Sequence, residues 1–365
     1  MITIVVGAQY GGEGKGKVTA YLSSLKKFDY ICRCGGPNSS HTIVNRKSRY
    51  RFRMLPTSVS EPKSRKATIL FGAGALIHIP TLFQEMSDWH VDPLQVRIDP
   101  LAGIISEDCI ASQRADTRYT QIGSTLTGTG YATAQRALRK LRLARDEDAL
   151  KTMLTDTRET LYRAANNGRN VLVEGHQGAQ LSNYHGDYPF TSSRDSTAAA
   201  MISELGLGLK WKYDVVLVFK AFQTRNHAGT LRNELSPRDA EILGISETGG
   251  GSWGIPDKTR RVGLFDPEVL SIAVKLNTPQ RLALTGSDYL FPSMRAQKSE
   301  REECPDLTRF ITSVEEQVRV PISIVSTGPR TEDAYLRNAK ERIEKKGSGS
   351  QNTEPDLFSD ITIPS

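Results

Sequence analysis

The sequence predicts an α/β fold in which a largely parallel sheet is flanked by helices and carries a P-loop-like nucleotide site. Short β-branched runs alternate with helical stretches, a pattern typical of parallel sheets. Several of these runs are apolar throughout, as expected for strands covered on both faces. Polar, glycine-rich segments follow the expected strand ends, which is where open parallel sheets bind their ligands.

The expected elements can be placed along the chain by residue number. Strands are expected at residues 2–6, 68–71, 170–173, 214–219, 281–284 and 322–325, and helices at 15–25, 132–150 (running on towards 166), 197–205 and 267–276. Glycine-rich or polar segments follow at 7–16, 174–178, 220–229, 285–288 and 326–329. Because the carboxyl ends of parallel strands meet at one edge of the sheet, these segments predict a single composite site.

Bulk composition limits the class of protein. The 365 residues are 38% apolar and 24% charged, an ordinary globular mixture, and no run approaches the length of a membrane span. We expect one α/β domain over residues 1–346 and a disordered Gly/Ser/Pro-rich tail over 347–365. Four cysteines without metal-ligand spacing (Cys32, Cys34, Cys109 and Cys304) indicate a reduced, cytoplasmic protein.

The net charge of +7 fits either nucleic acid or small polyanionic ligands. The densest basic run lies at residues 46–66. Alternation around Tyr50 and Phe52 favours a half-exposed strand with a cationic wet face over a nucleic-acid patch. We therefore expect neither a nucleic-acid nor a membrane partner.

The segment from Gly7 to Lys17 has the chemistry of a phosphate-binding loop. Its glycines allow a tight turn that presents backbone N–H groups to an anion, and the following helix adds its amino-terminal dipole. Compared with the P-loop consensus it is a near miss, since Gln9 replaces the first glycine and Gly16 replaces the magnesium-binding hydroxyl. A purely structural glycine turn is the alternative interpretation.

The run Gly-Gly-Glu-Gly-Lys-Gly-Lys resembles the phosphate loop of the adenylosuccinate synthetase family, which joins aspartate to C6 of inosine monophosphate using GTP. The resemblance implies the adenylosuccinate synthetase fold, Mg²⁺ and a catalytic Lys15. It also implies a triphosphate site made by Gly11, Gly12, Glu13, Gly14, Lys15, Gly16 and Lys17, continued by Ser40, His41, Thr42, Asp288, Ser326, Gly328 and Pro329.

A second motif, at residues 33–42, resembles the family segment that lines the nucleotide. There His41 is implied to steady the purine 6-oxygen as it takes on phosphate, and the Ser40 carbonyl to ligate magnesium. From spacing alone, a structural histidine is the alternative. Further resemblances imply a purine monophosphate site made by Asn38, Ser39, Ser124, Thr125, Arg139, Gln177, Leu181 and Thr191, with Arg139 reaching the neighbouring subunit of a homodimer.

Three departures from the family pattern bear on substrate choice. Gly12 stands where the family has an aspartate that acts as base on purine N1 and as a magnesium ligand, so positions 12 and 40 are the implied metal positions. Gly286 replaces the lysine that packs on guanine of GTP. The loop that clamps the aspartate substrate retains Lys258, Arg260 and Arg261. The chain is also short for the family, which we attribute to shortened peripheral subdomains.

These departures together resemble the phage-type branch, the 2-aminoadenylosuccinate synthetases. The sequence thus predicts a ligase that joins L-aspartate to C6 of dGMP through a 6-phosphoryl intermediate, in host cytoplasm if the gene is a phage's. Its catalytic positions would be Lys15, His41 and Gly12. ATP or dATP is the expected donor, in preference to GTP. The alternatives are an IMP- and GTP-dependent synthetase, a catalytically inactive nucleotide-binding regulator, and a nucleic-acid-binding P-loop ATPase.

Overall fold

The computed structural model describes residues 1–45, 48–245, 248–249 and 258–338, and its centre is a nine-stranded sheet. Every described pairing in this sheet is parallel except one, in which the edge strand formed by Ala334–Leu336 runs antiparallel to its neighbour. The spatial order is β17 (Ala334–Leu336), β16 (Ile322–Ser326), β15 (Arg281–Thr285), β10 (Tyr213–Lys220), β1 (Ile2–Gly7), β9 (Val171–Glu174), β2 (Tyr30–Arg33), β5 (Thr68–Phe71) and β7 (Val96–Ile98). The predicted largely parallel sheet is confirmed.

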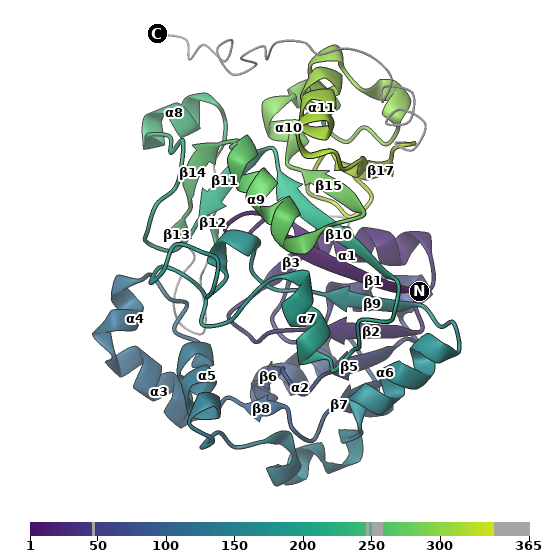
Figure 1. Ribbon diagram of the computed structural model, residues 1–365, viewed down its shortest axis with the longest axis vertical. Coiled ribbons are helices and arrows are strands. Elements are labelled where there is room, and N and C mark those ends of the chain that lie inside the picture. The colour runs from purple at the N-terminus through teal and green to yellow at the C-terminus, as the bar shows by residue number, and fades with distance from the viewer. Residues whose placement is uncertain (46–47, 246–247, 250–257, 339–365) are drawn as a thin grey trace.

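Helices cover both faces of this sheet (Figure 1). They are α1 (Lys15–Leu25), α2 (Ile79–Asp88), α3 (Glu107–Ala115), α4 (Thr117–Gln121), α5 (Thr129–Ala137), α6 (Thr157–Asn166), α7 (Ala198–Glu204), α8 (Pro237–Ile242), α9 (Pro267–Asn277), α10 (Ser287–Leu290) and α11 (Pro305–Val318). The 3-10 helices are η1 (Thr57–Ser60), η2 (Pro62–Ser64), η3 (Pro93–Gln95), η4 (Ala144–Asp146), η5 (Asp148–Met153), η6 (Ala179–Leu181), η7 (Pro292–Met294) and η8 (Glu300–Glu302).

Four two-stranded pairs complete the described secondary structure. They are β3 (His41–Asn45) with β4 (Ser48–Phe52), β6 (Leu76–Ile77) with β8 (Gly103–Ile104), β11 (Phe222–Arg225) with β14 (Arg261–Leu264), and β12 (Thr248–Gly249) with β13 (Lys258–Thr259). The expected strand is present as β4, but its first three residues are all exposed and only Phe52 is buried, so the predicted alternation of exposed and buried residues is not seen. The β11–β14 pair extends the chain beyond the end of β10, and the residues that flank it, Asn226, His227 and Arg260, line the site described below.

The position of β1 in the middle of the sheet explains why its sequence is apolar throughout. Ile4 belongs to a core cluster with residues of α7 and α9, whereas Val5 belongs to a second cluster with residues of α1. Successive side chains of a strand point to opposite faces, so each face of β1 is buried under a different helical layer. In Figure 1, α7 and α9 lie in front of the sheet and α1 lies behind it.

Most expected elements are present, but the long helix predicted over residues 132–150 is wrong. Helix α5 ends at Ala137, and Arg139 takes a left-handed conformation with φ 61°. The chain then forms η4 and η5 before α6 begins, where the Asp156 side chain accepts the Glu159 N–H at 2.9 Å. The apolar residues that suggested a continuous helix instead pack on separate neighbours, Leu141 beside Leu76 and Leu150 in the cluster around β5 and β7.

Three strands of the main sheet, β2, β7 and β17, were not predicted. β7 and β17 are only three residues long, and β2 is as long as the predicted β5 and β9 but has a single β-branched residue, Ile31. The four cysteines are free thiols. No helix in the described part of the chain is long and apolar enough to cross a membrane. The predicted disordered tail at 347–365 lies outside the described residues.

Candidate nucleotide-binding and active site

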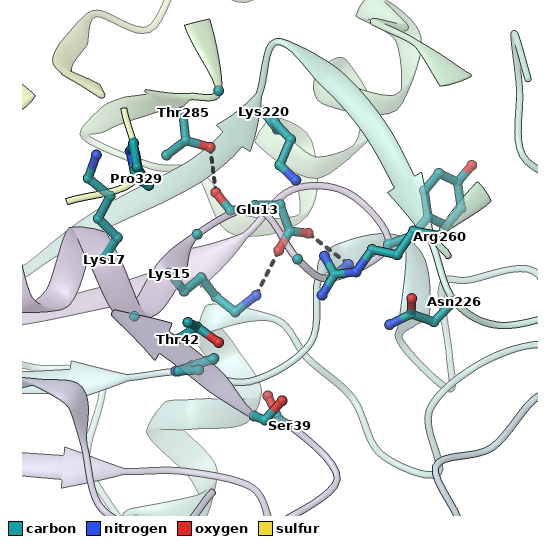
Figure 2. Close-up of a pocket in the computed structure, with 18 of the residues that line it drawn as sticks. Glu13, Lys15, Lys17, Ser39, Thr42, Lys220, Asn226, Arg260, Thr285 and Pro329 are labelled. Carbon is teal, nitrogen blue, oxygen red and sulfur yellow. Dashed lines mark hydrogen bonds and ion pairs between the residues drawn. The ribbon is translucent and has the colours of Figure 1, made fainter. Parts of the chain in front are cut away.

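The loop between β1 and α1 is organised around the carboxylate of Glu13, which is fully buried. Its Oε1 accepts the backbone N–H groups of Gln9 at 3.0 Å and Gly11 at 2.9 Å, and its Oε2 accepts Lys15 Nζ at 2.7 Å. Figure 2 shows Glu13 between Lys15 on one side and Arg260 on the other. The side chain of Glu13 thus shapes the loop from inside and holds Lys15, the loop's point charge, in place.

Two glycines make room for that carboxylate. A Cβ atom at Gly7 would lie 2.6 Å from Glu13 Oε2, and one at Gly178 would lie 2.2 Å from Glu13 Oε1. Real Cβ atoms do not approach an oxygen so closely, so glycine is required at the end of β1 and in the loop after β9. This packing fixes the loop against two neighbouring strands of the sheet.

Lys15 and Lys17 have different surroundings although both are buried. Lys17 Nζ donates to Ser326 Oγ at 2.5 Å, to the Asp333 carbonyl at 2.8 Å and to the Gly328 carbonyl. Burial lowers the pKa of Lys17 to about 8. The ammonium of Lys17 therefore ties α1 to the loop after β16. Lys15, by contrast, pairs with Glu13 of the preceding loop.

His41 forms the centre of a second buried group. Its Nδ1 lies 2.6 Å from Glu174 Oε1, while Glu174 Oε2 accepts the N–H and hydroxyl of Thr57 at 2.9 and 2.7 Å. Burial opposes ionisation of Glu174, but His41 and Arg33 hold its pKa below the ordinary value. The carboxylate therefore accepts the Nδ1 proton of His41 and sets the imidazole's orientation.

The remaining nitrogen of His41 has no partner among the described residues. Nε2 is buried without a hydrogen bond, and burial followed by the charge of Arg33 lowers the pKa of His41 to about 4. The imidazole of the ligand-free protein is thus neutral at pH 7. A phosphate or oxyanion beside Nε2 would favour the imidazolium, which donates from both nitrogens.

Two adjoining pockets bring most of the predicted site residues together. The first pocket, of about 470 Å³, is lined by Gly11, Gly12, Glu13, Gly14, Lys15, Gly16, Lys17, Asn38, Ser39, Ser40, His41, Thr42, Thr125, Gln177, Arg260, Asp288, Ser326, Gly328 and Pro329 among the predicted residues. The second pocket, of about 350 Å³, is lined by Asn38, Ser124, Thr125, Gln177 and Thr191 among them. Segments far apart in sequence therefore meet at the carboxyl edge of the sheet.

Four predicted residues are not in these linings. Leu181 is fully buried in a small apolar cluster with Tyr10. Arg139 is exposed two residues beyond the end of α5, rather than on a helix as predicted. Arg261 faces away from the first pocket and holds Glu234, with Nε 2.6 Å from Oε1. The side chain of Lys258 lies outside the described part of the chain.

Gly12 lies beside Arg260 at the front of the first pocket. Its φ is +75°, and a Cβ built there would stand 2.2 Å from Arg260 Nη1 and 3.2 Å from Thr224 Oγ1. The guanidinium of Arg260 therefore occupies the space in which a side chain of residue 12 would begin. A carboxylate at this position is absent, and no side chain of residue 12 can act as a base.

The opposite end of the first pocket is formed by α10 and the loop after β15. Asp288 lines the pocket, and its pKa is raised by burial. A Cβ at Gly286 would lie 2.9 Å from Lys220 Cγ and 3.1 Å from Phe222 Cε1. The stem of Lys220 and the ring of Phe222 thus fill the space beside Gly286.

Several pocket residues were not among the predicted site residues. Lys220, Tyr289 and Arg49 line the first pocket, Arg118 lines the second, and His227 lines both. Glu174 lines neither but positions His41. Its signal in the sequence was available, since it is the last residue of an otherwise apolar strand, where a charged side chain needs a buried partner.

The fold and these pockets define a nucleotide-binding protein with a variant phosphate loop at the carboxyl edge of a parallel sheet. The sequence model of the adenylosuccinate synthetase family matches residues 4–146 and 141–296. An adenylosuccinate synthetase of Methanococcus aeolicus is 36% identical over 342 residues, covering 90% of this chain and 96% of the relative. One of Methanocaldococcus jannaschii is 37% identical, covering 92% and 97%. The chain belongs to the adenylosuccinate synthetase family.

Solved structures agree on the fold. Fully ligated adenylosuccinate synthetase of Plasmodium falciparum superposes with a TM-score of 0.83 at 20% identity, covering 92% of this chain and 99% of that one. The succinoaminodeoxyadenylate synthetase of cyanophage S-2L, solved with dGMP and with dATP as energy donor, gives 0.76 at 24% identity, covering 94% and 97%.

The comparisons also correct one argument from the sequence. This chain spans nearly the whole length of archaeal relatives that are themselves adenylosuccinate synthetases. Its short length is therefore shared with that group and does not favour the phage-type branch. The family assignment makes the protein a ligase that joins aspartate to a purine nucleotide, with Mg²⁺ and a nucleoside triphosphate as phosphoryl donor.

Proposed function

We propose that this synthetase acts on dGMP, with ATP or dATP as donor, and so makes 2-amino-2′-deoxyadenylosuccinate for synthesis of DNA containing 2-aminoadenine. The observation that carries the proposal is Gly12, which replaces the aspartate expected to meet N1 of the purine. Guanine differs from hypoxanthine by an amino group on C2, beside N1. With glycine at position 12 no carboxylate stands against that amine, whereas an aspartate reaching past the guanidinium of Arg260 towards N1 would collide with it.

The first chemical step transfers the γ-phosphoryl group to the purine 6-oxygen. Lys15, the loop N–H groups that Glu13 does not occupy, and the amino end of α1 neutralise the transferring group. Mg²⁺ would be held by the phosphates and the Ser40 carbonyl, since Mg²⁺ commonly takes only one or two protein ligands beside phosphates; it supplies charge neutralisation there. The described residues contain no cluster of three His, Cys, Asp or Glu that could hold a metal alone.

His41 stabilises the 6-oxygen during that transfer. Because residue 12 supplies no base, the purine N1 proton is lost to solvent as the 6-oxygen gains negative charge. The imidazolium form of His41, protonated from solvent when the anionic phosphate binds beside Nε2, donates to that oxygen, while Glu174 keeps the ring aligned and balances its charge. In the second step the amine of L-aspartate attacks C6 and the phosphate leaves. Arg260, which lines the first pocket, would hold a carboxylate of that aspartate. We retain Lys258 as a proposed aspartate ligand; Arg261 would have to leave Glu234 to act as one.

The preference for an adenine donor rests on Gly286 and its neighbours. The lysine that would pack on guanine of GTP is missing, and the space beside Gly286 is filled by Lys220 and Phe222. Asp288, which remains in the pocket, can accept a hydrogen bond from the amino group of adenine. We also propose a single domain over residues 1–346 and a homodimer in which Arg139 reaches the partner's monophosphate.

A second candidate is an adenylosuccinate synthetase that uses IMP and GTP. It is favoured by the names of the archaeal relatives, which are 36–37% identical to this chain. An inactive nucleotide-binding regulator is the remaining alternative, because a lost general base removes about 10²- to 10⁴-fold in rate. The intact Lys15–Glu13 and His41–Glu174 pairs argue against decay of the site.

One experiment separates these candidates. The protein is incubated with L-aspartate, Mg²⁺ and each pairing of dGMP, GMP or IMP with ATP, dATP or GTP, and phosphate release is followed. The proposal predicts the largest kcat/KM for dGMP with ATP or dATP. Release with IMP and GTP alone would establish the second candidate, and no release from any pairing would leave only the regulator.

A further inference from the structure

The two pockets share a wall made by Asn38, Thr125, Gln177 and His227. Three of these residues are proposed to bind the purine monophosphate, but His227 is not among them. A nucleotide whose phosphate lies in the second pocket and whose base lies in the first must cross this wall with its sugar. The inference that follows rests on this placement, and therefore on the proposed function.

The backbone of His227 is held on two sides. Arg261 Nη1 donates to its carbonyl at 3.2 Å, and the N–H of the next residue, Ala228, donates to the Ile122 carbonyl at 3.3 Å. A Cβ at Gly123 would lie 3.0 Å from the Cα of His227, so the two turns are in direct contact. Arg261 also pairs with Glu234, so the turn that carries His227 is connected through Arg261 to the segment around Glu234.

The imidazole ring itself makes no hydrogen bond to any residue that the structure describes. Nδ1 is buried without a partner. Burial, and next the charge of Arg225, lowers the pKa of His227 to about 4, so the ring is neutral at pH 7. A neutral imidazole has one donor and one acceptor nitrogen, and leaving its buried Nδ1 unpaired is unfavourable.

We propose that His227 is a specificity residue that recognises the sugar of the purine monophosphate by a hydrogen bond to its 3′-hydroxyl. A hydroxyl both donates and accepts, so it suits either tautomer of the ring, and rotation of the ring about χ2 presents either edge to the pocket. In dGMP the 3′-hydroxyl is the only hydroxyl on the sugar. The phosphate and the base are engaged by the residues on either side of the wall.

The test is a cycle of protein and ligand changes measured as equilibrium dissociation constants by calorimetry. The ligands are dGMP and 2′,3′-dideoxyGMP, with dIMP and 2′,3′-dideoxyIMP as a parallel pair. The proteins are the wild type, His227→Phe, which keeps a ring without nitrogens, and His227→Asn, which keeps a hydrogen-bonding group. Loss of the 3′-hydroxyl is expected to raise the dissociation constant of the wild type about tenfold. In His227→Phe the same loss should raise the dissociation constant less than about twofold.

His227→Asn is expected to retain an intermediate hydroxyl effect. Arg118→Gln is the matched control, since Arg118 lines only the second pocket and its loss should weaken all four ligands alike, leaving the ratio unchanged. An equal 3′-hydroxyl effect in wild type and His227→Phe would overturn the inference, as would absence of binding by every ligand. A cycle seen with the inosine pair but not the guanine pair would support His227 and contradict the proposed acceptor.

Discussion

Replacing Gly12 by aspartate is the most informative single change. The new Cβ would start 2.2 Å from Arg260 Nη1 and 3.2 Å from Thr224 Oγ1, so the flexible end of Arg260 must move and Thr224 must shift slightly. The carboxylate would then extend into the first pocket towards the purine. If the clash between this carboxylate and the C2 amine of bound guanine costs what overpacking costs elsewhere, about 1–3 kcal/mol, it corresponds to about 5- to 150-fold in kcat/KM.

We expect Gly12→Asp to lower kcat/KM for dGMP by that factor and to lower it much less, or raise it, for IMP. Inosine has no C2 amine to collide with, and the new carboxylate can act as base on N1. The assay measures phosphate release at saturating aspartate, with saturating ATP in one set of reactions and saturating GTP in another.

Gly12→Asn is the matched control, because its side chain has the same shape and takes the same left-handed φ of +75°. Gly12→Asn should lower kcat/KM for dGMP as much as Gly12→Asp does, but it should not raise kcat/KM for IMP. Thermal unfolding of both variants reports any strain, which costs about 1 kcal/mol. Turnover of dGMP that is unchanged or faster in Gly12→Asp would refute the steric reasoning.

Three further predictions concern the buried charges. Lys15→Met should reduce phosphate release about 10²- to 10³-fold and also lower the Tm, because it leaves the buried carboxylate of Glu13 without its cation. Lys17→Met should lower the Tm with a smaller loss of phosphate release, because Lys17 ties α1 to the loop after β16. Equal losses of phosphate release in the two variants would contradict this distinction. Glu174→Gln should reduce kcat about 10- to 100-fold by releasing the alignment of His41, with a smaller change in KM; unchanged kcat would refute a positioning role. The free energy of unfolding should fall as the pH drops from 6.5 towards 4, because a histidine with a pKa of about 4 in the folded state takes up a proton on unfolding. For His227 the loss is at most about 3 kcal/mol, and chemical denaturation of His227→Asn should show a flatter pH dependence; an unaltered slope would contradict it.

The sequence predicted the central sheet well because its strands are short apolar runs that end in glycine or polar residues. Helix α1 was predicted at its full bounds, Lys15–Leu25, for a related reason: the glycine loop before it marks where the helix starts. The long helix over 132–150 failed because helical periodicity continues through residues whose apolar side chains pack on different elements. Local pattern carries no information about which neighbour each side chain meets.

The same limit applies to the site. Residues on one loop, such as Glu13 and Lys15, could be placed together because they are two positions apart. Glu174 and His41 are 133 positions apart, and they meet because β2 pairs with β9 and the chain then continues from β2 to His41 at the start of β3. Arg261 shows the converse, since its sequence context suggested a substrate ligand but Glu234 binds it.

The choice of purine is the central claim, and one competition measures it directly. The protein is given L-aspartate, Mg²⁺, ATP and GTP together with equal amounts of dGMP and IMP, and the succinylated products are separated and identified by mass. The account predicts that the 2-amino-2′-deoxyadenylosuccinate product predominates. A predominance of adenylosuccinate would contradict it and establish the IMP-dependent activity of the archaeal relatives.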